Sequence, residues 1–194
     1  MAAFDPLAGP RDATSPGLSL DEIARLLGAT ARIIEAELGG LGDSLAGWRP
    51  GPDEWCANEV AGHLVEADAR GYAGRIRRIL ASPPGVEPEE AGWDQPSVAA
   101  ARGDCAKPAS ELIDELSASR RDGIELVLSL QPEDLDRAAI HQRVGRVTVR
   151  ELINEWCTHD RVHVQQLLKS VQARAWPVMG NTRRFLVEQD GPEI

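Results

Sequence analysis

Residues 148–167 read TVRELINEWCTHDRVHVQQL, and this stretch decides the fold. Thr148 followed by Glu151 has the pattern of a capping box, which predicts the start of a helix. Apolar residues then recur at helical spacing, at Leu152, Trp156 and Leu167. His159 and His163 stand on the same stripe, about 6 Å apart along a helix axis. The stretch therefore predicts an amphipathic helix whose buried face carries two imidazoles.

A third histidine stands on the matching face of another predicted helix, where His63 lies among Val60, Leu64 and Ala67. Burying three imidazoles without partners costs several kcal/mol, so their nitrogens need a partner. A divalent metal ion is the simplest partner, and neutral imidazole is a good ligand for Zn²⁺, Ni²⁺ and Fe²⁺. Two histidines one turn apart are weak evidence alone, because most such pairs are surface or core residues. The three together predict a metal site formed by His63, His159 and His163.

The rest of the chain predicts an all-α protein. Four long helices are expected, over residues 19–38, 57–81, 109–130 and 148–170. The connections are a long loop over 82–107, two short extended pieces within 138–147, and a short C-terminal helix near 177–188. Four amphipathic helices of this length favour a four-helix bundle. We expect one bundle domain over 19–190, preceded by an irregular N-terminal arm over 1–18.

The bulk composition limits the classes of partner that we expect the protein to bind. The 194 residues suffice for one domain with a sizeable core, and the net charge of -10 argues against a nucleic-acid partner. The sequence has no apolar run of transmembrane length and no secretory signal pattern, so no membrane partner and a cytoplasmic location are expected. A homodimer is compatible with a bundle, although the sequence identifies no interface.

The three cysteines, Cys56, Cys105 and Cys157, form no CxxC pair. An odd number of cysteines without close pairs fits a reducing compartment and argues against a disulfide framework or a thiolate zinc site. We interpret Cys157 as a small core residue.

Several charged and aromatic residues have two interpretations each. The arginine clusters, Arg75, Arg77 and Arg78 and then Arg183 and Arg184, either grip a ligand carboxylate or pair with surface acids, and the second is favoured. Trp93 either roofs a pocket or anchors the 82–107 loop. Asp160 either orients an imidazole or is a surface residue that is solvated or paired with an arginine. Glu155 is either a general base or extra metal ligand, or a solvated side chain. The second interpretation is favoured for both. His141, outside the constellation, is expected to be an ordinary exposed or hydrogen-bonded residue.

Two groups of motifs carry a family resemblance. The first is WRP (48–50), DEWCANEV (53–60) and GHL (62–64); the second is GRVTVREL (145–152), HDRVH (159–163) and QQL (165–167). In these motifs the chain resembles the DinB/YfiT-like superfamily of metalloenzymes, which includes bacillithiol transferases and mycothiol-dependent maleylpyruvate isomerases. The likeness covers about residues 19–190 and implies an up-down-down-up four-helix bundle with one metal ion held by the three histidines.

Two positions depart from the family pattern. Cys56 stands where the family usually has Ser or Thr capping the second helix, and a weak cap is favoured over a reactive thiol. Both His159 and His163 are present, whereas the isomerase branch often replaces one of the pair by Glu. The pattern is therefore more similar to the thiol-transferase and plain DinB branches.

The resemblance implies a metal-dependent enzyme acting on a small molecule, with a low-molecular-weight thiol as a second cofactor. An open position on the metal would activate thiol or water, and S-transferase chemistry is the leading expectation. Hydrolase and isomerase chemistry remain alternatives. Because no convincing general base accompanies the histidines, a non-catalytic stress-response protein that binds a metal or small ligand also remains open.

Overall fold

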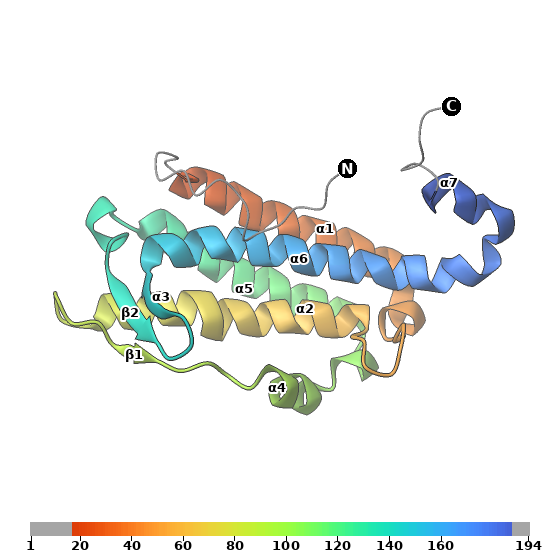
Figure 1. The fold of residues 1–194 in the computed structure, drawn as a ribbon, viewed down its shortest axis with the longest axis horizontal. Helices are drawn as coiled ribbons and strands as arrows, with labels where there is room; N and C mark the ends of the chain where they lie inside the picture. Colours follow the sequence, from red (N-terminus) through yellow and green to blue (C-terminus); the bar gives the residue numbers. More distant parts are fainter. Residues whose placement is uncertain (1–16, 188–194) are drawn as a thin grey trace.

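The computed structural model describes residues 17–187, and the long helices form a four-helix bundle (Figure 1). Helix α1 spans Leu20–Ala46, and α5 spans Ala109–Ser129. Helix α2 (Ala57–Glu66) continues through a π-helical turn, η1 (Ala67–Tyr72), into α3 (Ala73–Ala81). Helix α6 spans Val149–Ala175. The expected all-α bundle is confirmed.

The helices follow the order up-down-down-up. In Figure 1, α1 and α6 run in one direction along the bundle, while the α2–α3 rod and α5 run in the other. Helix α1 packs on α5 and α6, and α2 packs on the same two helices. The side chains of α2 and α6 therefore face each other across the bundle.

Two long helices begin with a capping box, and the one predicted at Thr148 is among them. The Ser19 hydroxyl accepts the backbone N–H of Glu22, and the Glu22 carboxylate accepts the Ser19 N–H, at the start of α1. Thr148 and Glu151 make the same reciprocal pair at the start of α6. These contacts satisfy helix amides that have no partner within the helix.

A small three-stranded sheet covers one end of the bundle (Figure 1). Strand β2 (Ala138–His141) pairs antiparallel with β3 (Gly145–Thr148), which confirms the two predicted extended pieces. Strand β1 (Glu89–Glu90) pairs parallel with β2, with Glu90 opposite His141. The sheet thus brings segment 82–107 beside the β2–β3 turn.

Several regions differ from the prediction, and α6 for example runs to Ala175 instead of ending near 170. Helix α1 passes through Gly39 and Gly40, and its break comes at Gly42, whose φ is 64°. A helical glycine costs only about 1 kcal/mol, which the packing of this helix outweighs. Segment 82–107 is not a plain loop, because it contains α4 (Gln95–Arg102) and a 3₁₀ turn (Asp104–Ala106). The C-terminal region has 3₁₀ turns at Trp176–Val178 and Gly180–Arg183 before the short α7 (Arg184–Val187). The last residue of the expected C-terminal helix, 188, lies outside the described part. A further 3₁₀ turn, Pro132–Asp134, follows α5.

The apolar core has two clusters. One lies toward the sheet and includes Ile23, Leu27, Ile76, Ile153 and Trp156. The other lies toward the opposite end and includes Ile34, Leu38, Val60, Leu64 and Leu112. The indole of Trp156 fits because residue 123 is glycine: a Cβ there would lie 2.6 Å from its ring. A polar layer, described below, separates the two clusters.

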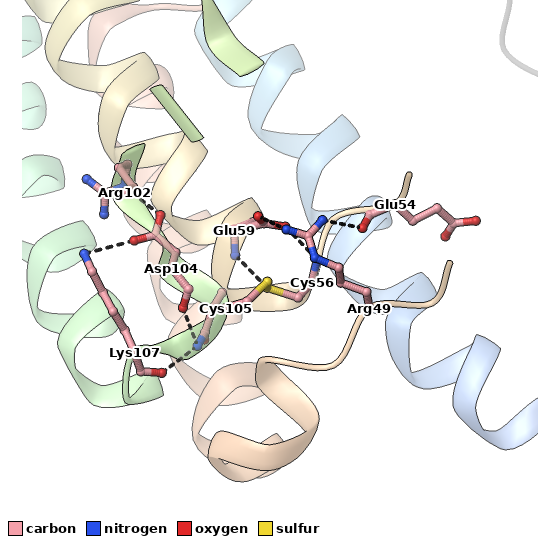
Figure 2. The surroundings of a disulfide bond; sticks show 9 residues. Arg49, Glu54, Cys56, Glu59, Arg102, Asp104, Cys105 and Lys107 are labelled. Carbon is pink, nitrogen blue, oxygen red and sulfur yellow. Dashed lines mark hydrogen bonds and ion pairs between the residues drawn. A yellow bond between two sulfur atoms is a disulfide. The ribbon is translucent and has the colours of Figure 1, made fainter. Parts of the chain in front are cut away.

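A disulfide joins Cys56 to Cys105, so the expectation that the cysteines form no disulfide is wrong (Figure 2). The cysteines are 49 residues apart, and a separation of this length gives no signal in the sequence. The pairing arises because segment 82–107 folds back onto the start of α2. The buried Asn58 amide there donates to the backbone oxygens of Asp104 and Lys107 at 3.2 and 2.9 Å.

Close contact at this junction also depends on Gly62. A Cβ at position 62 would lie 1.8 Å from the Asp104 carboxylate, which itself pairs with Arg102 and Lys107. The sulfur of Cys56 still accepts the Glu59 N–H at 3.4 Å, so it also acts as the predicted weak cap. No helix among residues 17–187 is both long and apolar enough to cross a membrane.

Candidate metal centre

The three histidines converge in the bundle interior. His63 comes from α2, and His159 and His163 come from α6; one ring nitrogen of each lies within 4.8 Å of those of the other two. The Nε2 atoms of His63 and His159 are 3.2 Å apart. Nitrogens bound about 2.0–2.1 Å from a tetrahedral zinc ion are about 3.3 Å apart, so this spacing fits ligands of one ion.

Neighbouring side chains hold the rings in place. The Nδ1 of His163 lies 2.8 Å from the side-chain oxygen of Gln166, so Nδ1–H donates and Nε2 remains available as a ligand. Trp55 lies 5.0 Å from the His63 ring and stacks on that of His163 at 6.3 Å. Trp93 stacks on His63, with 5.8 Å between the ring centres. This places Trp93 over the site, as the first of its two interpretations required.

Burial keeps the imidazoles neutral. It lowers the pKa of His63 to about 4, with a further effect of the His163 charge. Burial, followed by the charges of His163, His63 and Arg120, lowers the pKa of His159 to about 3. The pKa of His163 is also lowered by burial. Near pH 7 the cluster therefore presents neutral nitrogen donors, the form that binds metal ions.

A buried ionic network lies against the histidines. Arg120 of α5 donates to Asp160 at 2.7 Å and pairs with Asp68 of η1 at 3.1 Å. The Trp156 indole N–H donates to Asp68 at 2.8 Å. Burial raises the pKa of Asp68 to about 7, an effect that Arg120 opposes. Asp160 is thus paired with an arginine as favoured, but it is buried rather than at the surface.

A cleft of about 650 Å³ opens beside the cluster. His159 and Trp93 line it together with Tyr72, whose ring meets that of His159 edge-on at 5.5 Å. Glu155, one turn before His159, is exposed as expected and lines the same cleft. Burial, followed by the charge of Glu155 and its hydrogen bond, raises the pKa of the Tyr72 hydroxyl, which therefore stays protonated. The cleft gives a small molecule access to His159.

The family model for the DinB superfamily matches residues 26–167. The chain belongs to the DinB superfamily. Among curated proteins, none matches it significantly.

Two solved structures share this DinB fold. One is YfiT from Bacillus subtilis, described as a probable metal-dependent hydrolase with an unusual four-helix bundle topology. It is 14% identical, with a TM-score of 0.65 over 84% of this chain and 93% of that one. The other is a conserved protein from Enterococcus faecalis, also 14% identical, with a TM-score of 0.63 over 80% of this chain and 97% of that one. At this identity the likeness shows the fold alone.

The arginine clusters are mostly paired with acids, as favoured. Arg77 pairs with Asp122, and Arg78 makes two hydrogen bonds to Glu90. Arg183 donates to backbone oxygens of Trp176 and Pro177. Arg75 differs, because it lies against the same Glu90 carboxylate at 3.7 Å and also lines the cleft.

Two features of this DinB site were missed in the sequence. One is the ionic network, whose signal is a charged residue four positions after a core residue: Leu64 and Asp68, Leu116 and Arg120, and Trp156 and Asp160. The other is the part of the cleft formed by His141 and Arg143. His141 accepts the Arg143 backbone N–H at 3.2 Å, the ordinary hydrogen bond expected, but its place in the cleft depends on the sheet.

Proposed function

We propose that this DinB-superfamily protein is a divalent-metal-dependent enzyme that activates a low-molecular-weight thiol for transfer to an electrophile. The observation that carries the proposal is the convergence of three neutral imidazoles beside a cleft. His63, His159 and His163 would hold the ion, and Zn²⁺, Ni²⁺ and Fe²⁺ all suit this donor set. A bound ion with an open position lowers the pKa of a thiol or water and polarises carbonyl groups.

The protein's own residues prepare the site. Gln166 fixes which nitrogen of His163 faces the cluster. Trp55 and Trp93 cover His63 and restrict water on that side. Tyr72 is positioned as a hydrogen-bond donor and Glu155 as a proton acceptor on the cleft wall.

Hydrolysis is the second candidate, favoured by the description of YfiT as a probable metal-dependent hydrolase. The same cluster would then act on water instead of a thiol. Isomerase chemistry and a non-catalytic binding role remain the further alternatives. We also keep the cytoplasmic location as a prediction, although the Cys56–Cys105 disulfide removes the argument that rested on unpaired cysteines.

Metal binding is tested by titrating Co²⁺ into tag-free, metal-free protein and recording its visible absorption. We expect one tightly bound ion per chain, and loss of that ion in His159→Ala with the helical circular dichroism retained. His141→Ala is the matched control, since His141 lines the same cleft outside the cluster. Equal Co²⁺ binding by both variants would refute the three-histidine site.

The reaction class is tested on the loaded protein. 2-Mercaptoethanol should produce a sulfur-to-cobalt absorption band and support consumption of 1-chloro-2,4-dinitrobenzene that His159→Ala lacks. Turnover of p-nitrophenyl acetate without thiol, and no sulfur band, would replace transferase by hydrolase. If the loaded protein catalyses neither reaction with any thiol or ester, the non-catalytic binding role is the alternative that is left.

A further inference from the structure

The cleft has a second polar end, away from the histidine cluster. Arg75 of α3, His141 of β2 and Arg143 of the β2–β3 turn line it there. Arg75 follows Tyr72 by three residues, and the Tyr72 ring meets that of His159 at 5.5 Å. Figure 1 shows the strands at the end of the bundle where α6 begins. Because these cations and His159 line the same cleft, one small ligand can contact both.

The charges at this end are not balanced. Glu90 is the shared acid: Arg78 binds both its oxygens, at 2.7 and 2.6 Å. Arg75 lies 3.7 Å from the same carboxylate, yet its buried Nε has no hydrogen-bond partner in the described structure. Arg143 has no ion-pair partner among residues 17–187. One carboxylate therefore faces two guanidinium groups, and a third guanidinium stands beside them.

His141 lies within this positive field. Burial, followed by the charges of Arg75 and Arg143, lowers its pKa, while Glu90 opposes the shift. Both arginines are thus close enough to His141 to act on it electrostatically. In a chain with a net charge of -10, this end of the cleft is a local reversal of sign.

The cleft contains three more charged residues, Arg146, Glu151 and Glu155. Arg146 pairs with Glu87 at 2.7 Å. The Glu151 carboxylate is held by Thr148 in the capping box of α6. Glu155 lies one turn from His159. Glu151 lies in the first turn of α6, at the same end of the bundle as the sheet. The two acids therefore disfavour a dianion but allow a monoanion beside Arg75 and Arg143.

We propose that Arg75, His141 and Arg143 form a subsite for the carboxylate of a small organic acid. Guanidinium groups suit this ligand, because their planar N–H donors match the two oxygens of a carboxylate. The inference rests on the proposed function only in placing the ligand's reacting atom at the histidines. The subsite itself needs no metal ion, and it assigns the substrate or thiol to the class of monocarboxylates.

Calorimetric titration of metal-free protein with hexanoate and with hexanamide tests the subsite. The two probes have the same chain length and differ in charge. We expect hexanoate to bind about tenfold more tightly, since a hydrogen bond to a charged group contributes about that factor. Arg143→Gln and Arg75→Gln should each remove most of this preference. Arg77→Gln should keep it, because Arg77 pairs with Asp122 outside the cleft.

Equal affinity for the two probes would overturn the proposal, as would a preference that both cleft variants retain. Arg143 is exposed, so Arg143→Gln remains informative even if Arg75→Gln fails to fold. Co²⁺ titration of the same proteins separates this result from the proposed function. A hexanoate preference without Co²⁺ binding supports the subsite and rejects the metal enzyme, and Co²⁺ binding without the preference does the reverse.

Discussion

The disulfide between Cys56 and Cys105 makes the sharpest prediction about stability. It closes a loop with a sequence separation of 49, which contains the α2–α3 rod and segment 82–107 as far as Asp104. In the chain-entropy description, a cross-link over this separation destabilises the unfolded state by about 4 kcal/mol at 25 °C. Replacing both cysteines by serine should therefore lower the free energy of unfolding by about 3–4 kcal/mol.

The folded state should change little. Asn58 keeps its two hydrogen bonds to segment 82–107, and the pairs of Asp104 with Arg102 and Lys107 remain (Figure 2). Serine at position 56 is also a better helix cap than cysteine, which offsets a few tenths of a kcal/mol. The loss of stability should therefore come from the greater freedom of the unfolded chain, and the helical circular dichroism of the folded protein should not change.

Urea unfolding measures the effect. Wild-type protein with a phosphine reductant should match the Cys56→Ser/Cys105→Ser variant to within the cap contribution, and the variant itself should not respond to the reductant. Without reductant, denatured wild-type protein should show one reactive thiol, that of Cys157. Three thiols, or a wild-type midpoint that ignores the reductant, would refute the reasoning.

Two further predictions concern the polar layer. Arg120→Met leaves the Asp68 and Asp160 carboxylates buried without their cation. It should lower the free energy of unfolding by about 3–5 kcal/mol at pH 8, and by less at pH 5, where Asp68 is protonated. A decrease below about 1 kcal/mol in urea unfolding at pH 8 would contradict the network. In metal-free protein, the unfolded histidines take up protons near pH 6.5, whereas His63 and His159 do so only at about 4 and 3, so stability should fall as the pH drops through this window. The double variant His63→Gln/His159→Gln should show a smaller loss of stability over the same pH range. Thermal unfolding at a series of pH values measures this, and an equal loss in the variant and the wild type would contradict the prediction.

Much of the fold was accessible from the sequence because it depends on local rules. Apolar periodicity and the capping box at Thr148 located the long helices, and the two extended pieces expected within 138–147 are β2 and β3. The end of α1 was misplaced because packing outweighs the local cost of Gly39 and Gly40. Segment 82–107 was treated as a loop, although α4 has local signals in the Asp94 cap and in Gly103 at its end. Only its position against α2 depends on distant contacts.

The candidate site divides in the same way. The three histidines were found because imidazoles on an apolar stripe conflict with burial, and the sequence displays that conflict directly. Arg143 was not found, since it lies on an exposed turn and gains its place only when the sheet brings it beside Arg75. The disulfide was rejected on a count of cysteines, and a count carries no information on which sulfurs meet in space.

The π-helical turn η1 explains how one rod serves both the core and the polar layer. Leu64, Asp68, Tyr72 and Ile76 are all buried, although each is four residues from the next. In an α-helix a step of four residues overshoots one turn by about 40°, so three steps would rotate Ile76 about 120° from Leu64. Hydrogen bonds from i to i+5 wind the chain more loosely and absorb this drift. The turn therefore keeps Asp68 and Tyr72 directed at α6, beside His159, where an uninterrupted α-helix would turn the later members of the row away.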